Sequence, residues 1–338
     1  MTAPVNHLDK LAIFQVDFDL WSGQVKLESP DLKIKDDDKP DVEVVDLGRK
    51  YIINRKHLRP FNSLKTQARR LCLRYGMAFF EGAFAVPIDK IDLVSAELDG
   101  IAEKMKDITS DFLSNYDKWV DEWIIAKPEY SEAIRIGRLP KAVVEKRFGF
   151  DYQIYQMNPV NEVQTNKLNG MAAGLADELM DEIVEEANRF FHSCLKGKES
   201  CQANTQKTLK RLCDKVDGLS FLDSRFLSVV ELLNKTISGY AGVGKTVIGE
   251  QFYRVLSATL ILSSRDKIKE YASGDIDVCD MANSFMLGSS DDTQSQAESN
   301  VVTIEQVDSD LPDETLPDED DIDQFFRKHV ANGEGMFF

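Results

Sequence analysis

Residues Val94–Trp123 read VSAELDGIAEKMKDITSDFLSNYDKWVDEW, and this stretch decides the fold class. Its apolar residues recur at steps of three and four, which places them on one face of an α-helix. The pattern lasts for about four seven-residue repeats, as in a coiled coil, and Pro128 ends it. The sequence thus predicts one long helix whose apolar face consists of Val94, Leu98, Ile101, Met105, Ile108, Phe112, Tyr116, Trp119 and Trp123.

Two more apolar stripes follow Asn161, separated by the polar segment Lys196–Thr205. Two long amphipathic helices with a short connection predict an antiparallel helical hairpin, similar to a coiled-coil bundle. A further helix at Val247–Leu262 and a shorter one at Ser264–Ala272 complete this part. The stripes consist of Leu168, Met171, Leu175, Leu179, Ile183, Ala187, Phe190 and Cys194, and of Leu209, Leu212, Val216, Leu219, Phe226, Val229, Leu233 and Ile237.

The N-terminal part has the alternation of β-strands. Apolar and polar residues alternate between Ala12 and Leu20, as in a half-buried strand, and again in Phe148–Met157. Trp21–Gly23 is typical of a turn into Gln24–Leu27, which predicts a hairpin. The predicted fold is therefore mainly α with a small N-terminal β part (α+β). We expect an α+β domain at 1–160, a helical hairpin and bundle at 161–286, and a disordered acidic tail with a docking motif at 287–338.

The negative charge is concentrated in the tail. Of a net charge of −17, thirteen Asp and Glu residues lie in Ser290–Asp323, which contains no Lys or Arg. This composition buries too little apolar area to offset chain entropy, so we expect disorder. The sequence LPDE occurs at Leu311–Glu314 and again at Leu316–Glu319, before an aromatic end. We interpret it as a short docking motif; the alternative is a solubilising tail. The candidate partner-binding residues are Asp313, Glu314, Asp318, Glu319, Phe325 and Phe326.

A basic segment lies upstream of the long helix. Arg49–Phe80 contains nine Lys and Arg residues and no Asp or Glu, and Phe61–Tyr75 has helical periodicity. A basic amphipathic helix contacts nucleic acid, an anionic surface or an acidic protein segment, or is simply a solvated helix. We expect Arg69, Arg70 and Arg74 to be exposed and to contact an acidic partner.

One nucleotide-binding motif is matched. Gly239–Thr246, GYAGVGKT, fits G-x-x-x-x-G-K-[ST], in which Lys245 would reach phosphates and Thr246 would hold magnesium. A P-loop follows a buried strand, whereas Phe226–Ser238 has an amphipathic helical pattern. We therefore predict a helix-to-helix turn with Gly239 as the C-cap and a new helix from about Lys245, and we expect no catalytic residue, enzymatic activity or cofactor. The alternative is a P-loop protein that binds nucleotide through Gly239, Gly244, Lys245 and Thr246.

The sequence gives little support for a membrane span, a secretory signal or a metal site. No apolar run is long enough for a membrane span, and the N-terminus has no secretory pattern, so we expect a cytoplasmic protein. The spacing of the only candidate zinc ligands matches no closed site, so we expect no metal. These ligands are His192, Cys194, Cys201 and Cys213.

Four motifs carry a family resemblance: WSGQVKL at Trp21–Leu27, the basic stretch Arg55–Gly76, AFAVP at Ala83–Pro87 and FLSNYDKWVDEW at Phe112–Trp123. From Leu8 to about Pro159 the chain resembles a bacterial and phage family known as domain of unknown function 3150, and the helical half is compatible with it. The resemblance implies no catalytic residue. It implies a setting on a mobile element, beside a MoxR/cobaltochelatase-type AAA-plus ATPase and a von Willebrand factor A domain protein.

From this setting we expect a non-enzymatic adaptor or scaffold subunit that works with both proteins and that can itself oligomerise. The alternatives are the P-loop protein that uses Lys245 and a DNA-associated factor that uses Arg49–Arg74.

Overall fold

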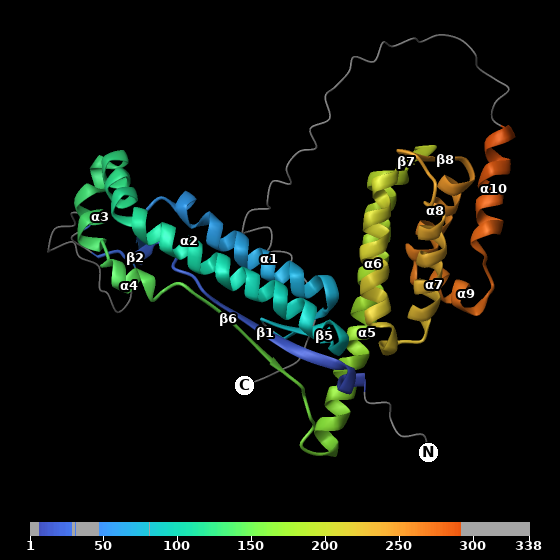
Figure 1. Ribbon diagram of the computed structural model, residues 1–338, viewed down its shortest axis with the longest axis horizontal. Coiled ribbons are helices and arrows are strands. Elements are labelled where there is room, and N and C mark those ends of the chain that lie inside the picture. The colour runs from blue at the N-terminus through green and yellow to red at the C-terminus, as the bar shows by residue number, and fades with distance from the viewer. Residues whose placement is uncertain (1–6, 29–30, 32–46, 81, 292–338) are drawn as a thin grey trace, which may run out of the picture. The chain divides into compact units, whose positions relative to one another are not determined.

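The computed structural model describes residues 7–28, 31, 47–80 and 82–291. They form a mostly helical unit (Figure 1). This unit contains a four-stranded antiparallel sheet in the order β4-β5-β1-β6. The central strand is β1 (Leu11–Asp19). Every residue of β6 (Gly149–Tyr155) pairs with residues 13–19 of β1. The predicted fold class and both of these strands are confirmed. Within the described residues, no helix has the length and apolar content needed to cross a membrane.

The other two strands, β4 (Met77–Phe80) and β5 (Ala83–Pro87), were not predicted. They are short and are joined through Gly82, whose φ of 73° suits the turn. The predicted hairpin of Gln24–Leu27 with the first strand is wrong. β2 (Gln24–Lys26) pairs instead with β3 (Arg49–Tyr51), because the turn at Gly23 leads the chain away from β1 and the Gly23 carbonyl accepts from Ile52 N–H at 3.0 Å.

One face of the sheet is covered by helices that precede and follow β4 and β5. The short η4 (Arg55–Leu58) leads into α1 (Arg59–Tyr75), and η5 (Ile88–Lys90) leads into the long α2 (Ile91–Ala126). Figure 1 shows α1 and α2 side by side, as their contacts require. Three short elements then return the chain to β6: η6 (Pro128–Tyr130), α3 (Ser131–Gly137) and α4 (Lys141–Glu145).

The long helix is confirmed, but its buried face turns along its length. Val94 to Phe112 follow the predicted stripe, with Ile108 only half-buried. Farther along, Val120 and Ile124 are buried in place of Trp119 and Trp123. The reason is a change of neighbours, because the C-terminal half of α2 packs against α3 and α4.

The second half of the described unit is helical. Its long first helix is α5 (Glu162–Phe190), extended by the π-helical turn η7 (Phe191–Leu195). The predicted second long helix is broken after Gly218 into α6 (Gln206–Gly218) and α7 (Arg225–Ser238), which pack against each other. The other elements are β7 (Ser200–Gln202), η8 (Ala203–Thr205), η9 (Ser220–Leu222), β8 (Thr246–Ile248), α8 (Gly249–Leu262), α9 (Arg265–Ser273) and α10 (Val278–Asp291).

The alternation of β1 divides the hydrophobic residues into two cores. Ala12 and Phe14 face α1 and α2, whereas Leu11 and Ile13 belong to the core formed with α5 to α9. Successive side chains of a strand point to opposite faces, so one strand contributes to both cores.

Candidate anion-binding surface

The basic segment forms a helix because its apolar residues meet the sheet and α2. In α1 the buried side chains are Phe61, Leu64, Ala68, Leu71 and Cys72, at helical spacing. Pro60 suits the first turn, where its missing N–H removes no helical bond. The helix ends at Gly76, where a Cβ would lie 2.3 Å from the backbone oxygen of Ala85, so the close approach to β5 excludes a larger residue.

The opposite side of this segment is cationic. Seven Lys and Arg side chains are exposed there, of which Arg55 lies 5.6 Å from the centre of the Tyr51 ring. The other six form no salt bridge with any residue in the described part of the chain. By contrast, six of the eight described arginines outside Arg49–Arg74 pair with a carboxylate. We call the six residues the cationic surface: Arg49, Lys56, Arg59, Lys65, Arg70 and Arg74.

Part of this surface is a continuous stripe. Arg59, Ser63, Gln67, Arg70 and Arg74 follow each other at steps of three and four, so they lie along one side of α1. Next to this stripe is a groove of about 330 Å³ between α1 and α2. It is lined by Pro60, Ser63, Leu64 and Gln67 of α1 and by Lys104, Asp107 and Ile108 of α2.

The three predicted arginines differ in exposure. Arg70 and Arg74 are exposed, and the Arg74 guanidinium lies 5.1 Å from the centre of the Tyr75 ring. Arg69 is half-buried, contrary to the prediction, because it lies beside the buried Ala68 at the margin of the packed face. The exposed cationic stripe therefore contains two of the three predicted residues.

The structure adds aromatic residues that the sequence did not assign to this surface. His57 stacks on Trp119 with ring centres 4.0 Å apart, and Lys127 lies 5.3 Å from the Trp123 ring. Trp123 Nε1 donates to the Tyr51 carbonyl at 3.1 Å, which joins α2 to β3. Partial burial and the neighbouring Lys56 lower the pKa of His57, which favours the neutral imidazole. No local signal identified the two tryptophans, because helical spacing assigned them to the core.

The Gly239–Thr246 segment follows a helix, α7, as predicted, and Gly239 is its C-cap. Lys245 is exposed, and its carbonyl accepts from Ala203 N–H at 2.9 Å. The predicted new helix from about Lys245 is wrong. Residues 246–248 form β8, which pairs with β7, and α8 begins only at Gly249. The Tyr240 side chain is buried, and its hydroxyl lies 3.0 Å from Thr205 Oγ1.

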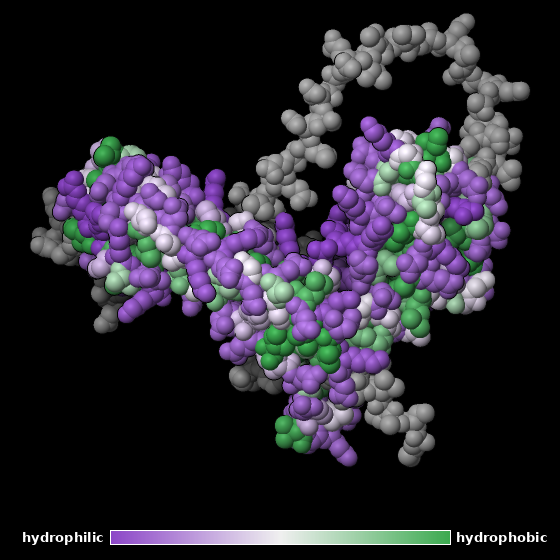
Figure 2. All heavy atoms as spheres, in the orientation of Figure 1, coloured by the Kyte–Doolittle hydropathy of each residue, from purple (hydrophilic) through white to green (hydrophobic). Residues whose placement is uncertain are grey.

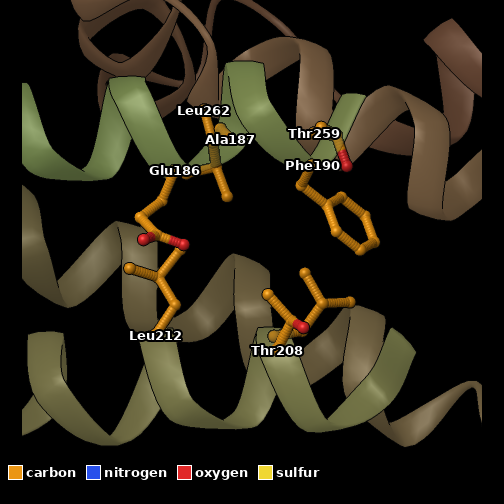
Figure 3. A pocket seen from close by; sticks show the side chains of 8 residues that line it. Glu186, Ala187, Phe190, Thr208, Leu212, Thr259 and Leu262 are labelled. Carbon is orange, nitrogen blue, oxygen red and sulfur yellow. The ribbon is translucent and has the colours of Figure 1, made fainter. Parts of the chain in front are cut away.

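A small cavity lies between α5, α6 and α8 (Figure 3). Phe190, Thr208 and Leu212 are among the side chains that line it, and its volume of about 10 Å³ is at most the room of one water molecule. Within the described ranges, no group of three His, Cys, Asp or Glu side chains is placed to hold a metal ion. The predicted tail residues Asp313, Glu314, Asp318, Glu319, Phe325 and Phe326 lie outside the described residues.

Comparison with known proteins gives one match. A family model described as "Protein of unknown function (DUF3150)" matches residues 8–264, which include the cationic surface and the Gly239–Thr246 turn. No curated protein and no solved structure matches the chain.

Proposed function

Since the chain belongs to the DUF3150 family, whose description names no activity, we propose a function from its surface chemistry: a non-enzymatic adaptor that binds an acidic protein segment. The observation that carries this proposal is the set of six exposed cations without an acidic partner among the described residues. Exposed charges that are not neutralised within a protein attract oppositely charged partners and increase the rate of association.

The form of the surface favours an extended polypeptide. The cationic stripe runs along α1 from Arg59 to Arg74, and the adjacent groove is lined by Ser63 and Gln67, which can hydrogen-bond a backbone or a carboxylate. The groove also presents the apolar Ile108 and Leu64. An acidic segment with an apolar or aromatic residue would therefore find both charge and hydrophobic contact.

The proposed partners are those that the family resemblance suggests. They are a MoxR-type AAA-plus ATPase and a von Willebrand factor A domain protein encoded beside this chain on a bacterial mobile element or phage, in the cytoplasm. In this proposal the chain contributes binding surfaces, and the partner supplies ATP hydrolysis. Nucleic acid is the competing occupant, because phosphates also bind exposed Arg and Lys.

The test is co-purification of the chain with these two proteins at native expression. Charge reversal by Arg70→Glu together with Arg74→Glu should reduce partner affinity at least tenfold. The matched control is Lys146→Glu with Arg147→Glu, which makes the same change in net charge at two exposed residues that lack a salt bridge within the described residues. Capture of the partners should also weaken between low and physiological salt, where the Debye length falls to about 8 Å.

Undiminished capture by the charge-reversal variant would contradict the proposal. Retention of DNA or RNA by the wild type, lost in the variant and unchanged in the control, would assign the cationic surface to nucleic acid instead.

A further inference from the structure

The two edges of the four-stranded sheet differ in how well they are protected. β4, at one edge, has only four residues, and its pairing with β5 shifts in register between Ala78 and Phe80. Short length and a bulge are devices that prevent an edge strand from pairing further. β6, at the other edge, has seven residues in uninterrupted register with β1 and contains no Pro and no Lys. Figure 1 shows β6 along the side of the sheet.

The free hydrogen-bonding groups of β6 can be identified from its neighbours. Val16 N–H donates to the Gly82 carbonyl at 3.0 Å, so the even-numbered residues of β1 bond toward β5. The odd-numbered residues of β1 therefore bond toward β6, where they pair with odd-numbered residues such as Asp151. It follows that Phe150, Tyr152 and Ile154 direct their N–H and C=O groups away from the sheet.

An independent contact agrees with this assignment. Tyr152 N–H donates to Oδ1 of Asp151 at 2.9 Å, which places that N–H on the open side of the strand. A side-chain carboxylate thus occupies one of the outward donors. For Phe150 and Ile154, no hydrogen bond on the outward side is present among the residues that the structure describes. Ile154 and Tyr155 are 39% and 41% exposed, so apolar side chains accompany the open backbone groups.

We propose that β6 pairs antiparallel with the β6 of a second copy of this chain, with Tyr152 at the two-fold axis. Tyr152 is the central residue of Gly149–Tyr155, so this register uses the whole strand of both copies. Residues with outward backbone groups then face each other, as a hydrogen-bonded antiparallel pair requires. At the central pair, the carbonyl of Tyr152 in the other copy replaces the Asp151 carboxylate as the acceptor of Tyr152 N–H. Two sheets of four strands would join into one continuous sheet of eight.

The side chains that meet in this register are complementary. Phe150 faces Ile154 of the other copy, an aromatic and β-branched pair of the kind that stabilises sheets. Asp151 faces the Gln153 amide, so no like charges are opposite each other. Gly149 faces the Tyr155 ring, which compensates for the missing glycine side chain. None of these opposite pairs brings like charges together, and this self-complementarity favours a second copy over an unrelated extended segment.

The experiment measures the mass of the full chain by sedimentation equilibrium across micromolar concentrations. We expect reversible conversion from 38.2 kDa to twice that mass. Ile154→Pro removes an outward donor but leaves the ladder to β1 intact, and Ile154→Lys introduces a charge opposite Phe150. Both variants should raise the dimer dissociation constant at least tenfold. Ile125→Lys is the matched control, because Ile125 lies on α2 and is 79% exposed.

A cross-linking experiment tests the register without depending on the fold of these variants. Asp151→Cys together with Gln153→Cys, in a Cys279→Ser background, places each new thiol opposite the other position in the second copy. Non-hydrogen-bonded antiparallel pairs have Cα atoms about 4.5 Å apart, within the range of a disulfide. Oxidised glutathione should therefore produce a covalent dimer from the double variant and none from either single variant.

Three results would overturn the proposal. They are a wild-type chain that stays monomeric throughout, Ile154 variants that dimerise as well as the control, and single cysteine variants that cross-link as readily as the double one. A monomer whose β6 binds an extended segment of another protein would also overturn it.

Discussion

Replacing Lys215 with methionine is expected to destabilise the fold, because this buried lysine joins three helices. The side chain is 5% exposed, and Nζ lies 2.6 and 2.8 Å from the two carboxylate oxygens of Glu182 on α5. Nζ also donates to the carbonyl of Leu73 at 2.8 Å. Leu73 is in the last turn of α1, where carbonyls lack a helical partner and a cation interacts favourably with the helix dipole.

The magnitude follows from these contacts. Breaking a fully buried ion pair by removing one partner costs about 3–5 kcal/mol. The Glu182 carboxylate is 37% exposed and can be solvated, which reduces this figure. The Leu73 carbonyl loses its hydrogen bond from Lys215, which adds about 1 kcal/mol. Lys215→Met should therefore lower the free energy of unfolding by about 2–3 kcal/mol.

The assay is urea unfolding followed by circular dichroism, with wild type and variants compared at pH 7. Lys210→Met on the same helix is the control, because Lys210 is exposed and should change stability by less than about 0.5 kcal/mol. A double-mutant cycle with Glu182→Gln isolates the ion pair from the contact with Leu73. Equal stability of the Lys215 and Lys210 variants would refute the role assigned to Lys215.

Three further predictions test other features. Lys245→Ala should leave the melting temperature unchanged, and ATP should not raise it; a P-loop saturated at 100 times its Kd would gain about 2.7 kcal/mol. Hydrogen bonds from Arg225 lower the pKa of Asp223 below its ordinary value of 3.8. Because this pKa is depressed in the fold, the stabilisation is present above pH 3.8 and is lost as pH falls through the folded-state pKa, so the deficit of Asp223→Asn should shrink in acid unfolding experiments. Removal of residues 290–338, or addition of EDTA, should reduce capture of the von Willebrand factor A domain partner if a tail carboxylate completes its metal coordination; full capture under both conditions would exclude tail docking.

The proposed surface was predictable only in part. Arg70 and Arg74 could be placed on the exposed side of α1 because helical periodicity fixes which residues face the core. The half-burial of Arg69 could not, since it depends on how closely neighbouring elements approach the margin of the helix. His57 and Trp119 are far apart in sequence and stack only because η4 meets the C-terminal half of α2.

The sequence by itself determined the elements whose signal is local. The long α2, the amphipathic α1 and the alternating β1 all follow from the spacing of apolar residues within one segment. The alternation of β1 also places its side chains on two faces, which belong to two cores. Nothing in the strand itself shows which helices cover each face.

The tertiary structure decided which elements meet. β2 pairs with β3 rather than β1. The predicted second long helix breaks at Gly218, because α6 and α7 pack against each other. β6 is open at its outer edge for a similar reason, since the order of strands is set by the connections and packing of the whole sheet. Such outcomes depend on contacts between residues far apart in the chain, and the periodicity of one segment contains no information about its partner.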